Sequence, residues 1–485
     1  MKNRSSDLPE ELKLQASPDY IPISISKRPF DAIFQRAESE DTPILAIVTG
    51  TKPDFYKQAP LVLEAQKQGV PTFIVNTGQH FDDVLGFGLK EFDLEKYAIC
   101  NLHIRGNLME KASELLLKFG LFGRFCSENY KDVSVLPIVH GDTLVAGIAT
   151  MGWVFGVGQK VAQNEAGLRS MSPKAVKTLR PNSAPSSKEI QTFIDNQLYS
   201  DWFIAREEPF PEQIDTWVCS AGTQYFFAPV QLNRENLVRE GYPQEDIHVV
   251  GNSVVDAINT KRKEKPERSI FDFYPQLEKG EWLRIDIHRR ENLTERRFEA
   301  IISGVVQLVR KGYKIVFVKM NATANALKSY NLEANLAKLA EENAKNFVVT
   351  PLWREYANVV EFLDSGRCWA ELTDSGSMQE ELLYFPQVLS MTARLSTDRP
   401  ETVFAAKSNI LVPPVNSDWI ARTVKLLDSN RSEFLQKKQI YGQPGEVSSK
   451  IISVIKKEFE SGKGFFPWFH HRIGLWKDSK NIGYL

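Results

Sequence analysis

The sequence predicts an α/β protein with two Rossmann-like, doubly wound domains that face each other across a cleft. Short apolar runs alternate with amphipathic stretches over most of the 485 residues, and polar residues follow the apolar runs. The same alternation resumes after a charged linker at 261–269. Alternating strands and helices build parallel sheets, and such sheets bind ligands at the carboxyl ends of their strands. Two similar halves therefore predict a site between them.

The prediction divides the chain into an extension, two domains and a terminal segment. Residues 1–42 form a polar N-terminal extension, and 43–258 form the first domain. Ser, Pro and Lys are abundant in 170–210, which interrupts the alternation and indicates an inserted surface segment near the cleft. The second domain covers 270–460, and the aromatic-rich 461–485 is expected to pack back on a domain.

Each predicted strand is a short apolar run that ends at polar residues. ILAIV at 44–48 opens the first domain, and an amphipathic helix is expected from Pro60 to Gln68. Further strands of this domain are expected at 72–76 and within 133–143, 159–167 and 247–258. The second domain has runs of the same kind at 282–288, 313–318, 346–350, 371–374 and 387–391.

Composition narrows the class of protein. With 42% hydrophobic residues the chain fills two cores. Lys and Arg number 60 against 61 Asp and Glu, so no overall basicity points to nucleic acid or to an anionic membrane. The longest apolar stretch, 145–158, is too short to span a bilayer, and the N-terminus lacks the apolar core of a signal peptide. Four distant cysteines fit reduced thiols. We expect a soluble cytoplasmic protein.

The stretch TDSGSMQEE, residues 373–381, has the order strand, small-residue turn, helix. Ser375, Gly376 and Ser377 allow close approach of an anion, which the following helix N-terminus also favours. Glu380 and Glu381 are expected in the first helical turn, where a carboxylate favours the helix or accepts hydrogen bonds from ribose hydroxyls. The alternative is an ordinary helix start capped by Asp or Ser.

Other polar motifs also follow predicted strands. Any one of them alone is more typical of a capped turn or a surface ion pair, but all of them together indicate a site at the strand ends. The histidine and the two arginines of HRREN suit a diphosphate. The motifs are GTKPD at 50–54 with Lys57, HGDT at 140–143, NEAGLR at 164–169, Pro211-Glu212, HRREN at 288–292 and STDRPE at 396–401.

Two common nucleotide chemistries are disfavoured. The strand–helix junctions carry neither a Rossmann GxGxxG nor a P-loop GxxxxGK, which argues against nicotinamide and ATP chemistry. No group of Asp, Glu and His has the spacing of a metal site. The pair His470-His471 has no third ligand in register, so packing or surface exposure is the expected role.

The order of the motifs resembles the UDP-N-acetylglucosamine 2-epimerase family, which has the two-domain GT-B fold. The matching runs extend from about Ile44 to Lys457. They are GTKPDFYKQAP at 50–60, TGQH at 77–80, HGDT at 140–143, EAGLR at 165–169, PEQ at 211–213 followed by FAP at 227–229, GNSVVD at 251–256, HRREN at 288–292, SGSMQEE at 375–381 and TDRPE at 397–401.

The sequence also departs from the family pattern. Lys52 and Asp54 replace the usual Arg and Glu, and DFYK resembles the hydrolysing branch, whereas HGDT, EAGLR and HRREN resemble the non-hydrolysing branch. The segment 170–210 replaces a much shorter join. Of the residues resembling a regulatory sugar-nucleotide site, Gln79 and His80 remain while Phe81 and Asn107 differ. Gln213, Asp215 and Thr216 stand in place of Glu, Asn and Arg, and Met320 stands where histidine is common.

The resemblance implies a reaction and a set of site residues. The proton on sugar C2 is removed while UDP leaves C1, and both add back to the bound 2-acetamidoglucal to give the other C2 configuration. The implied catalytic residues are Asp142, Glu165, Glu212 and His288. The implied contacts to the UDP-sugar come from Lys52, Lys57, Arg289, Asn321, Ser375, Gly376, Ser377, Glu381 and Arg399, with Glu381 at the ribose.

The resemblance also implies a homodimer whose second domain binds UDP, with a UDP-sugar as the ligand and with no cofactor and no metal. Neither nucleic acid nor a membrane is expected as a partner. The non-hydrolysing reaction is the main prediction. Three alternatives stay open: a hydrolysing epimerase that releases UDP and N-acetylmannosamine, an epimerase for a related UDP-acetamido sugar, and an inactive UDP-sugar-binding protein.

Overall fold

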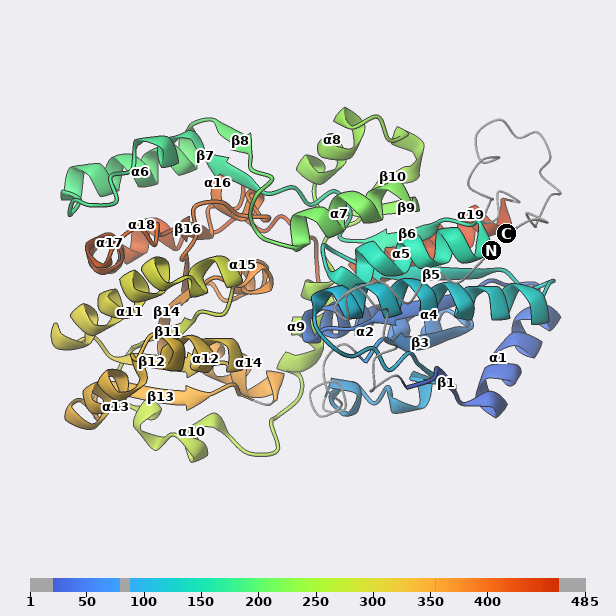
Figure 1. Cartoon of the computed structure of the whole chain (residues 1–485), viewed down its shortest axis with the longest axis horizontal. Helices are drawn as coiled ribbons and strands as arrows, with labels where there is room; N and C mark the ends of the chain where they lie inside the picture. The colour runs from blue at the N-terminus through green and yellow to red at the C-terminus, as the bar shows by residue number, and fades with distance from the viewer. Residues whose placement is uncertain (1–20, 79–87, 354, 462–485) are drawn as a thin grey trace, which may run out of the picture.

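The computed structural model describes residues 21–78, 88–353 and 355–461. Two parallel sheets, each covered by helices, form the two halves of the molecule, which stand side by side in Figure 1. The predicted fold class is therefore confirmed. Within the described residues, no helix is both long and apolar enough to cross a bilayer.

The first sheet has eight strands and is parallel except at one edge, where β1 runs antiparallel to β4. Its central strands are short apolar runs buried on both faces, as parallel sheets require. In spatial order the strands are β1 (Ser24–Ile25), β4 (Cys100–Asn101), β3 (Thr72–Asn76), β2 (Ile44–Thr49), β5 (Val135–His140), β6 (Val161–Asn164), β9 (Thr223–Ala228) and β10 (Ile247–Val249).

The second sheet has six parallel strands, and its order is that of a Rossmann fold, 3-2-1-4-5-6 in the domain's own sequence. The direction of winding reverses between β11 and β14, which are neighbours in the sheet. In spatial order the strands are β13 (Phe347–Pro351), β12 (Ile315–Lys319), β11 (Trp282–Asp286), β14 (Cys368–Thr373), β15 (Leu389–Thr392) and β16 (Asn409–Leu411).

Helices cover both sheets, and side chains cap several of them at the N-terminus. Thr51 and Asp54 form a capping box at the start of α2, and Thr143 caps α5. The first sheet carries α1 (Lys27–Glu40), α2 (Lys52–Lys67), α4 (Leu108–Asn129), α5 (Leu144–Val157), α7 (Glu212–Ala221), α8 (Gln231–Arg239) and α9 (Val254–Arg262). The second carries α10 (Ile270–Phe273), α11 (Glu295–Arg310), α12 (Asn321–Ser329), α13 (Glu333–Glu342), α14 (Tyr356–Asp364), α15 (Gly376–Glu381), α16 (Glu401–Phe404), α17 (Ser417–Ser429) and α18 (Arg431–Phe434).

The chain returns to the first half at its end. Helix α19 (Val447–Glu460) belongs to the stretch that the sequence analysis gives to the second domain, yet it packs on α2 and α9. Helix α1 lies in the stretch expected to be a polar extension, and it buries Phe30 and Phe34 in the first core. The predicted aromatic segment 461–485 falls almost entirely outside the described residues.

Residues 170–204, which we call the strap, differ most from expectation. They contain β7 (Met171–Pro173), α6 (Ser187–Tyr199) and β8 (Trp202–Ile204), where β7 pairs with β8. Although the strap joins two parts of the first domain, α6 lies beside α16 and α17 of the second (Figure 1). Phe193 is buried against Trp419, with ring centroids 5.7 Å apart. The strap is thus packed on the second domain.

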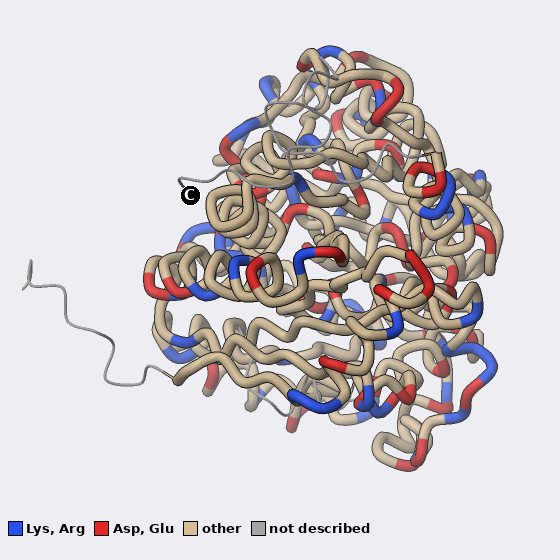
Figure 2. The backbone as a smooth tube through the Cα atoms, turned by 90° about the vertical axis from the view of Figure 1, so that its right-hand side faces the viewer, with Lys and Arg blue, Asp and Glu red and all other residues tan. Residues whose placement is uncertain are grey.

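Charges of both signs alternate along the chain. Figure 2 shows Lys and Arg interspersed with Asp and Glu on the first half, with no long stretch of one sign. This pattern agrees with the formal net charge of −1. The part of the chain seen in this view therefore shows no long basic run of the kind that binds nucleic acid.

Candidate active site

The predicted site residues lie where the two sheets meet. Asp142 and Glu165 follow β5 and β6 of the first sheet, and His288 and Arg289 follow β11 of the second. Ser375 comes after β14, the strand that pairs with β11 across the reversal of winding. Ligands bind at such switch points in doubly wound sheets. The two crevices face each other and make one site.

Glu165 has a backbone conformation that side chains rarely adopt. Its φ is +57°, in the left-handed region, and its side chain is fully buried. Asn164 lies directly before it, and the Asn164 side chain accepts a hydrogen bond from the Glu165 N–H and donates one to Ser253. Residues in this region cost free energy and cluster at functional sites. The turn aims the Glu165 carboxylate into the cleft.

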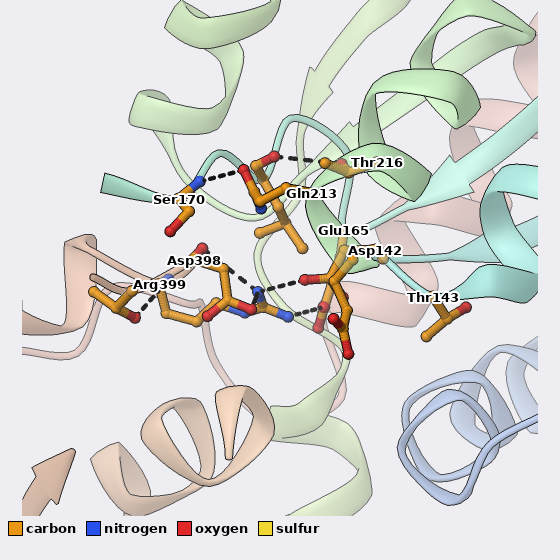
Figure 3. Close-up of polar contacts among 12 residues, drawn as sticks. Asp142, Thr143, Glu165, Ser170, Gln213, Thr216, Asp398 and Arg399 are labelled. Carbon is orange, nitrogen blue, oxygen red and sulfur yellow. Dashed lines mark hydrogen bonds and ion pairs between the residues drawn. The ribbon is translucent and has the colours of Figure 1, made fainter. Parts of the chain in front are cut away.

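Arg399 crosses the cleft and joins carboxylates from both domains. Its Nη1 lies 3.3 Å from Oδ2 of Asp142, and its Nη2 lies 3.2 Å from Oε2 of Glu165. Its Nε donates to Oε1 of Glu380 at 2.6 Å. Figure 3 shows the guanidinium reaching from the loop after β15 to Asp142 and Glu165. One cation thus holds three buried acids in place.

Lys57 makes a second link of this kind. Its ammonium donates to Oε1 of Glu165 at 2.6 Å and to Oε2 of Glu380, and all three side chains are buried. Asn252 donates to the other oxygen of Glu380 at 2.8 Å. Although burial opposes ionisation, the charges of Lys57 and His140 hold the pKa of Glu165 well below its ordinary value. Glu165 is therefore ionised at neutral pH.

His140 stands between two acids. Its Nδ1 lies 3.1 Å from Oδ1 of Asp54, and its Nε2 lies 3.3 Å from Oε2 of Glu165. Burial alone would lower its pKa, but the charge of Glu165 and the hydrogen bonds to both acids raise the pKa of His140 to about 9. The imidazole is therefore a cation at neutral pH.

Asp142 differs from Glu165 in how readily it takes a proton. Burial and the negative charge of Asp398 raise the pKa of Asp142 to about 7, even though Arg399 opposes the shift. Asp398 contacts Arg394 and Arg399, whose charges hold its pKa below the ordinary value despite burial. Asp398 is thus ionised, and Asp142 beside it is able to exchange a proton near neutrality.

Glu212 and His288 lie on the strap side of the same cleft. Glu212, the first residue of α7, forms an ion pair with Arg289 that again joins the two domains. Nδ1 of His288 lies 3.2 Å from Oδ1 of Asp374, and Asp374 also accepts hydrogen bonds from the backbone N–H groups of His288 and Arg289. Asp374 therefore fixes the HRREN turn against the second sheet.

The turn after β14 agrees with its predicted start but not with its predicted end. Ser375 caps α15, and a Cβ at Gly376 would lie 3.1 Å from the carboxylate of Asp398, so a side chain there would crowd the site. The prediction that Glu380 and Glu381 occupy the first helical turn is wrong. They are the last two residues of this six-residue helix, because it already begins at Gly376.

Glu381 has different partners from Glu380. It accepts hydrogen bonds from Tyr356 at 2.7 Å and from Ser377 at 2.6 Å. The Tyr356 ring lies 4.8 Å from that of Tyr56, and the Lys52 ammonium lies 5.3 Å from the centroid of the Tyr56 ring. Burial lowers the pKa of Lys52, although the charges of Glu91 and Glu381 act in the opposite direction. Lys52, Ser377 and Glu381 thus lie around Tyr56 and Tyr356, whose rings are tilted against each other, beside the charged network.

A comparison with protein families decides the classification. The model of the UDP-N-acetylglucosamine 2-epimerase family matches residues 204–456, slightly more than half of the chain. The chain belongs to the UDP-N-acetylglucosamine 2-epimerase family. It is therefore an enzyme of the epimerase class, and the resemblance found in the sequence is confirmed.

Full-length relatives of the family agree. The chain is similar to UDP-N-acetylglucosamine 2-epimerase of Methanocaldococcus jannaschii, at 28% identity over 85% of this chain and 98% of that protein. The enzyme of the same name from Bacillus subtilis is 27% identical over 84% of this chain and 93% of its own length.

Solved structures show the same fold. The M. jannaschii epimerase in complex with UDP-GlcNAc and UDP has a TM-score of 0.67 at 24% identity, over 85% of this chain and 99% of that one. The Neisseria meningitidis UDP-GlcNAc 2-epimerase bound to UDP-GlcNAc has a TM-score of 0.65 at 24% identity, over 86% and 100%.

Within this family member, three departures from the pattern lie together on α7. Gln213 accepts a hydrogen bond from the N–H of Ser170 at 2.9 Å (Figure 3). Thr216 accepts one from Nη1 of Arg169 at 3.2 Å. Asp215, which lies between these two residues in the sequence, is also buried. Gln213 and Thr216 thus hold the start of the strap against α7.

Not every predicted site residue joins the network. Asn321 is exposed at the first residue of α12, and the structure gives its side chain no hydrogen bond to another described residue. Asn107 caps α4, whereas Gln79, His80 and Phe81 lie outside the described residues, as do His470 and His471. Among the residues that are described, no three His, Cys, Asp or Glu side chains are arranged to hold a metal ion.

Sequence reasoning missed the partners that complete the network. Asp54, Asn252, Glu380 and Asp398 are all part of motifs that the sequence shows, but no spacing rule says which acid meets which cation. For Lys57 and Glu380 the separation is 323 residues. Only their position along the sequence could have indicated these four residues. Each of these four lies in a turn or a first or last helical turn next to a predicted strand end.

Proposed function

We propose that the protein converts UDP-N-acetylglucosamine to UDP-N-acetylmannosamine by epimerisation at sugar C2. The observation that carries this proposal is the cluster of buried carboxylates around Arg399. Asp142 and Glu165 come from one side of the cleft and Glu380 from the other. A site with both ionised and protonatable acids beside fixed cations suits proton exchange on a nucleotide sugar.

In the proposed reaction, a carboxylate takes the proton from C2. The C–H electron pair forms the C1–C2 double bond, and the C1–O bond breaks with its electron pair going to UDP. Return of a proton to the opposite face of C2 and of UDP to C1 gives the epimer. Every bond broken in the first half is remade in the second, so no oxidant, metal or water is consumed.

We assign the proton transfers to Asp142, with Glu212 of the same domain as its partner. The pKa of Asp142, about 7, matches a group that gives and takes protons at neutral pH. Glu165 stays ionised between Lys57, His140 and Arg399, so its role is to hold those cations in position. His288, fixed by Asp374, lies on the side of the second domain.

The leaving UDP requires a cation clamp, and the cleft supplies one. Arg399 and Arg289 are each paired with a carboxylate of the first domain. We propose that the diphosphate replaces these carboxylates as the ion-pair partner of the two guanidiniums. Lys52, Lys57, Ser375, Gly376 and Ser377 would then surround the diphosphate. Displacement by the diphosphate would leave Asp142 and Glu212 without their cations, which makes them stronger bases. Glu381, beside Tyr356, is our choice for the ribose.

Retention of UDP is the finer part of the proposal. Backbone pairing of Met171 with Thr397 and the ion pairs of Arg289 and Arg399 hold the two sides of the cleft together. A closed, dry cleft favours re-addition of UDP over attack by water. We therefore propose the non-hydrolysing reaction.

Incubation with UDP-N-acetylglucosamine in D₂O, followed by NMR, tests this proposal. We expect deuterium at C2, appearance of the UDP-N-acetylmannosamine signals, and no accumulation of free UDP. Free UDP rising in step with N-acetylmannosamine would replace the proposal by the hydrolysing reaction. Absence of C2 exchange with this substrate, but exchange with another UDP-acetamido sugar, would change the substrate. No exchange with either would leave a binding protein.

Three further expectations are part of the proposal. We propose a domain boundary at the charged linker 261–269, with α1 and α19 belonging to the first domain, a homodimer, and a cytoplasmic location. Light scattering on the purified full chain measures the oligomeric state, and a mass equal to one chain would contradict the dimer. Limited proteolysis followed by mass spectrometry tests whether the first cuts fall at 261–269.

A further inference from the structure

Asp215 is a buried acid at the edge of the site that the mechanism above does not use. It lies one turn after Glu212 on α7, so the two side chains share a helix face. Only 3% of Asp215 is exposed. A Cβ built at Gly147 would lie 2.9 Å from the Asp215 Cα and 3.0 Å from its Oδ1. The carboxyl group thus packs directly on the first turn of α5, the helix that begins just after Asp142.

Asp215 lacks the cationic partner that other acids of the site have. In the part of the chain that the structure describes, no Lys, Arg or His lies within ion-pair distance of it, and its Oδ2 is buried without a hydrogen-bond partner. Five other acids of the site each contact a cation: Asp142 and Arg399, Glu165 and Lys57, Glu212 and Arg289, Glu380 and Lys57, Asp398 and Arg394. A buried carboxylate without a cation is costly, and protonation removes that cost.

The acids near Asp215 disfavour its ionised form, and the nearby cation Arg169 is paired with another carboxylate. Helix α5 brings no ionisable side chain. Asp142 from the loop before α5 and Glu212 from α7 bring negative charge, and Cys219 from α7 has a neutral thiol because burial raises its pKa to about 12. Arg169 from the segment after β6 contacts Glu240 at 2.6 Å. Burial first, and then the charges of Glu212 and Asp142, raise the pKa of Asp215 to about 8.

We propose that Asp215 is a positioning residue that keeps a proton beside Asp142 and Glu212 and thereby limits the reaction at alkaline pH. The family pattern has asparagine here, a neutral side chain of the same shape, and protonated aspartic acid reproduces that neutrality. Loss of the proton would add a third negative charge next to the two proton-transferring acids. That charge raises the pKa of Asp142 and repels the diphosphate, so both kcat and the affinity fall. The inference rests on the proposed function for its kinetic consequence.

Asp215→Asn separates this role from a structural one. We expect wild-type kcat/KM for UDP-N-acetylglucosamine to fall above about pH 8, roughly tenfold per pH unit as for one ionisation. In Asp215→Asn this alkaline fall disappears, because an amide cannot lose the proton. Asp418→Asn, a surface variant on α17, keeps the wild-type profile. The same alkaline fall in Asp215→Asn as in wild type would overturn the proposal.

A second measurement does not depend on activity. Infrared difference spectra between wild type and Asp215→Asn should show a protonated carboxylic acid at neutral pH that ionises near pH 8. The spectra of wild type minus Asp418→Asn should lack that band. If wild type shows no epimerase activity but the band is present, the proposed function fails while the protonated state of Asp215 stands. If the band is absent, Asp215 is ionised and this inference fails, whatever the activity.

Discussion

Nη1 of Arg399 lies 3.3 Å from Oδ2 of Asp142, although the two residues belong to different sheets and are 257 residues apart in sequence. Both side chains are buried, so water screens their attraction little. The contact places a cation of the second domain on an acid of the first whose pKa is raised to about 7. Binding of an anionic ligand at Arg399 and ionisation of Asp142 are therefore coupled.

Arg399→Lys should weaken UDP binding without removing the charge. Lysine cannot contact Asp142, Glu165 and Glu380 at once, and loss of one charge-assisted hydrogen bond costs about 1.5–3 kcal/mol. That range corresponds to a roughly 10- to 150-fold rise in Kd, measured by calorimetry. Arg310→Lys, exposed at the end of α11, is the control. Equal UDP affinity in Arg399→Lys and wild type would exclude Arg399 from the diphosphate site.

Removal of Ser375 tests the other side of the same clamp. Ser375→Ala should also lose UDP affinity, by a similar amount if its hydroxyl donates to the diphosphate. Because Ser375 also caps α15, loss of the cap costs about 1 kcal/mol of stability. Thermal unfolding measured with and without UDP distinguishes these effects. A drop in Tm with unchanged stabilisation by UDP would show a cap only.

The three acids at the first-domain side should respond differently to neutralisation. Asp142→Asn and Glu212→Gln should reduce kcat by ~10²–10⁴, the range typical of a lost general acid or base. Glu165→Gln should also lose stability, about 3–5 kcal/mol, because Lys57, His140 and Arg399 lose the charge that they share. Turnover and urea denaturation of each variant measure the two effects. A stable but inactive Glu165→Gln would instead make Glu165 a proton-transfer group.

His140 should make the protein less stable at alkaline pH. Its pKa in the folded chain is about 9, above the ordinary 6.5, so the folded state holds this proton more tightly than the unfolded state. The resulting stabilisation, on the order of 3 kcal/mol, is complete below pH 6.5 and is lost as pH rises through 9. The Tm of wild type should therefore fall over this range.

His140→Gln is the variant that isolates this effect. It should be less stable than wild type at neutral pH, and the difference should shrink toward pH 9 and above. Parallel Tm curves for His140→Gln and wild type across the whole range would mean that His140 is neutral when folded.

Local patterns predicted the strands and the places of the acids. The run at 44–48 is β2, and Asp142, Glu165 and Ser375 each follow a strand, because burial of a parallel strand forces an apolar run that ends at the ligand edge. The pairing of Lys57 with Glu380 could not be predicted in this way. It depends on how two domains approach, and no residue pattern within either domain records that.

The sequence of the strap contains the spacing of an amphipathic helix, but its Ser, Pro and Lys content favoured the prediction of a surface insertion. Its buried residues Ile190, Phe193, Ile194 and Gln197 have the spacing i, i+3, i+4, i+7 of an amphipathic helix. The Ser, Pro and Lys of 171–188 favoured a surface insertion instead. Helical spacing shows that a face is buried but not against which partner, so the packing of α6 on α17 required the structure.

Gln197 anchors the strap to the second sheet, and its removal should loosen the cleft. Its side chain accepts a hydrogen bond from the N–H of Leu411 at 2.7 Å and donates to the Leu411 carbonyl at 3.2 Å. Leu411 lies on β16, the edge strand, so Gln197 takes the place of a further strand. In Gln197→Ala two buried backbone groups lose their partners, which costs about 1–3 kcal/mol.

The functional consequence follows from where the strap leads. Its first residues pair with Thr397, two positions before Arg399, so a loosened strap should let UDP escape before re-addition. We expect Gln197→Ala to release more free UDP per epimerisation event than wild type, measured by NMR in D₂O. Gln191→Ala, which removes a bond to Asp195 within α6, should match wild type. An unchanged ratio in Gln197→Ala, with the Tm lowered as expected, would show that the strap stabilises the second domain without holding the cleft closed.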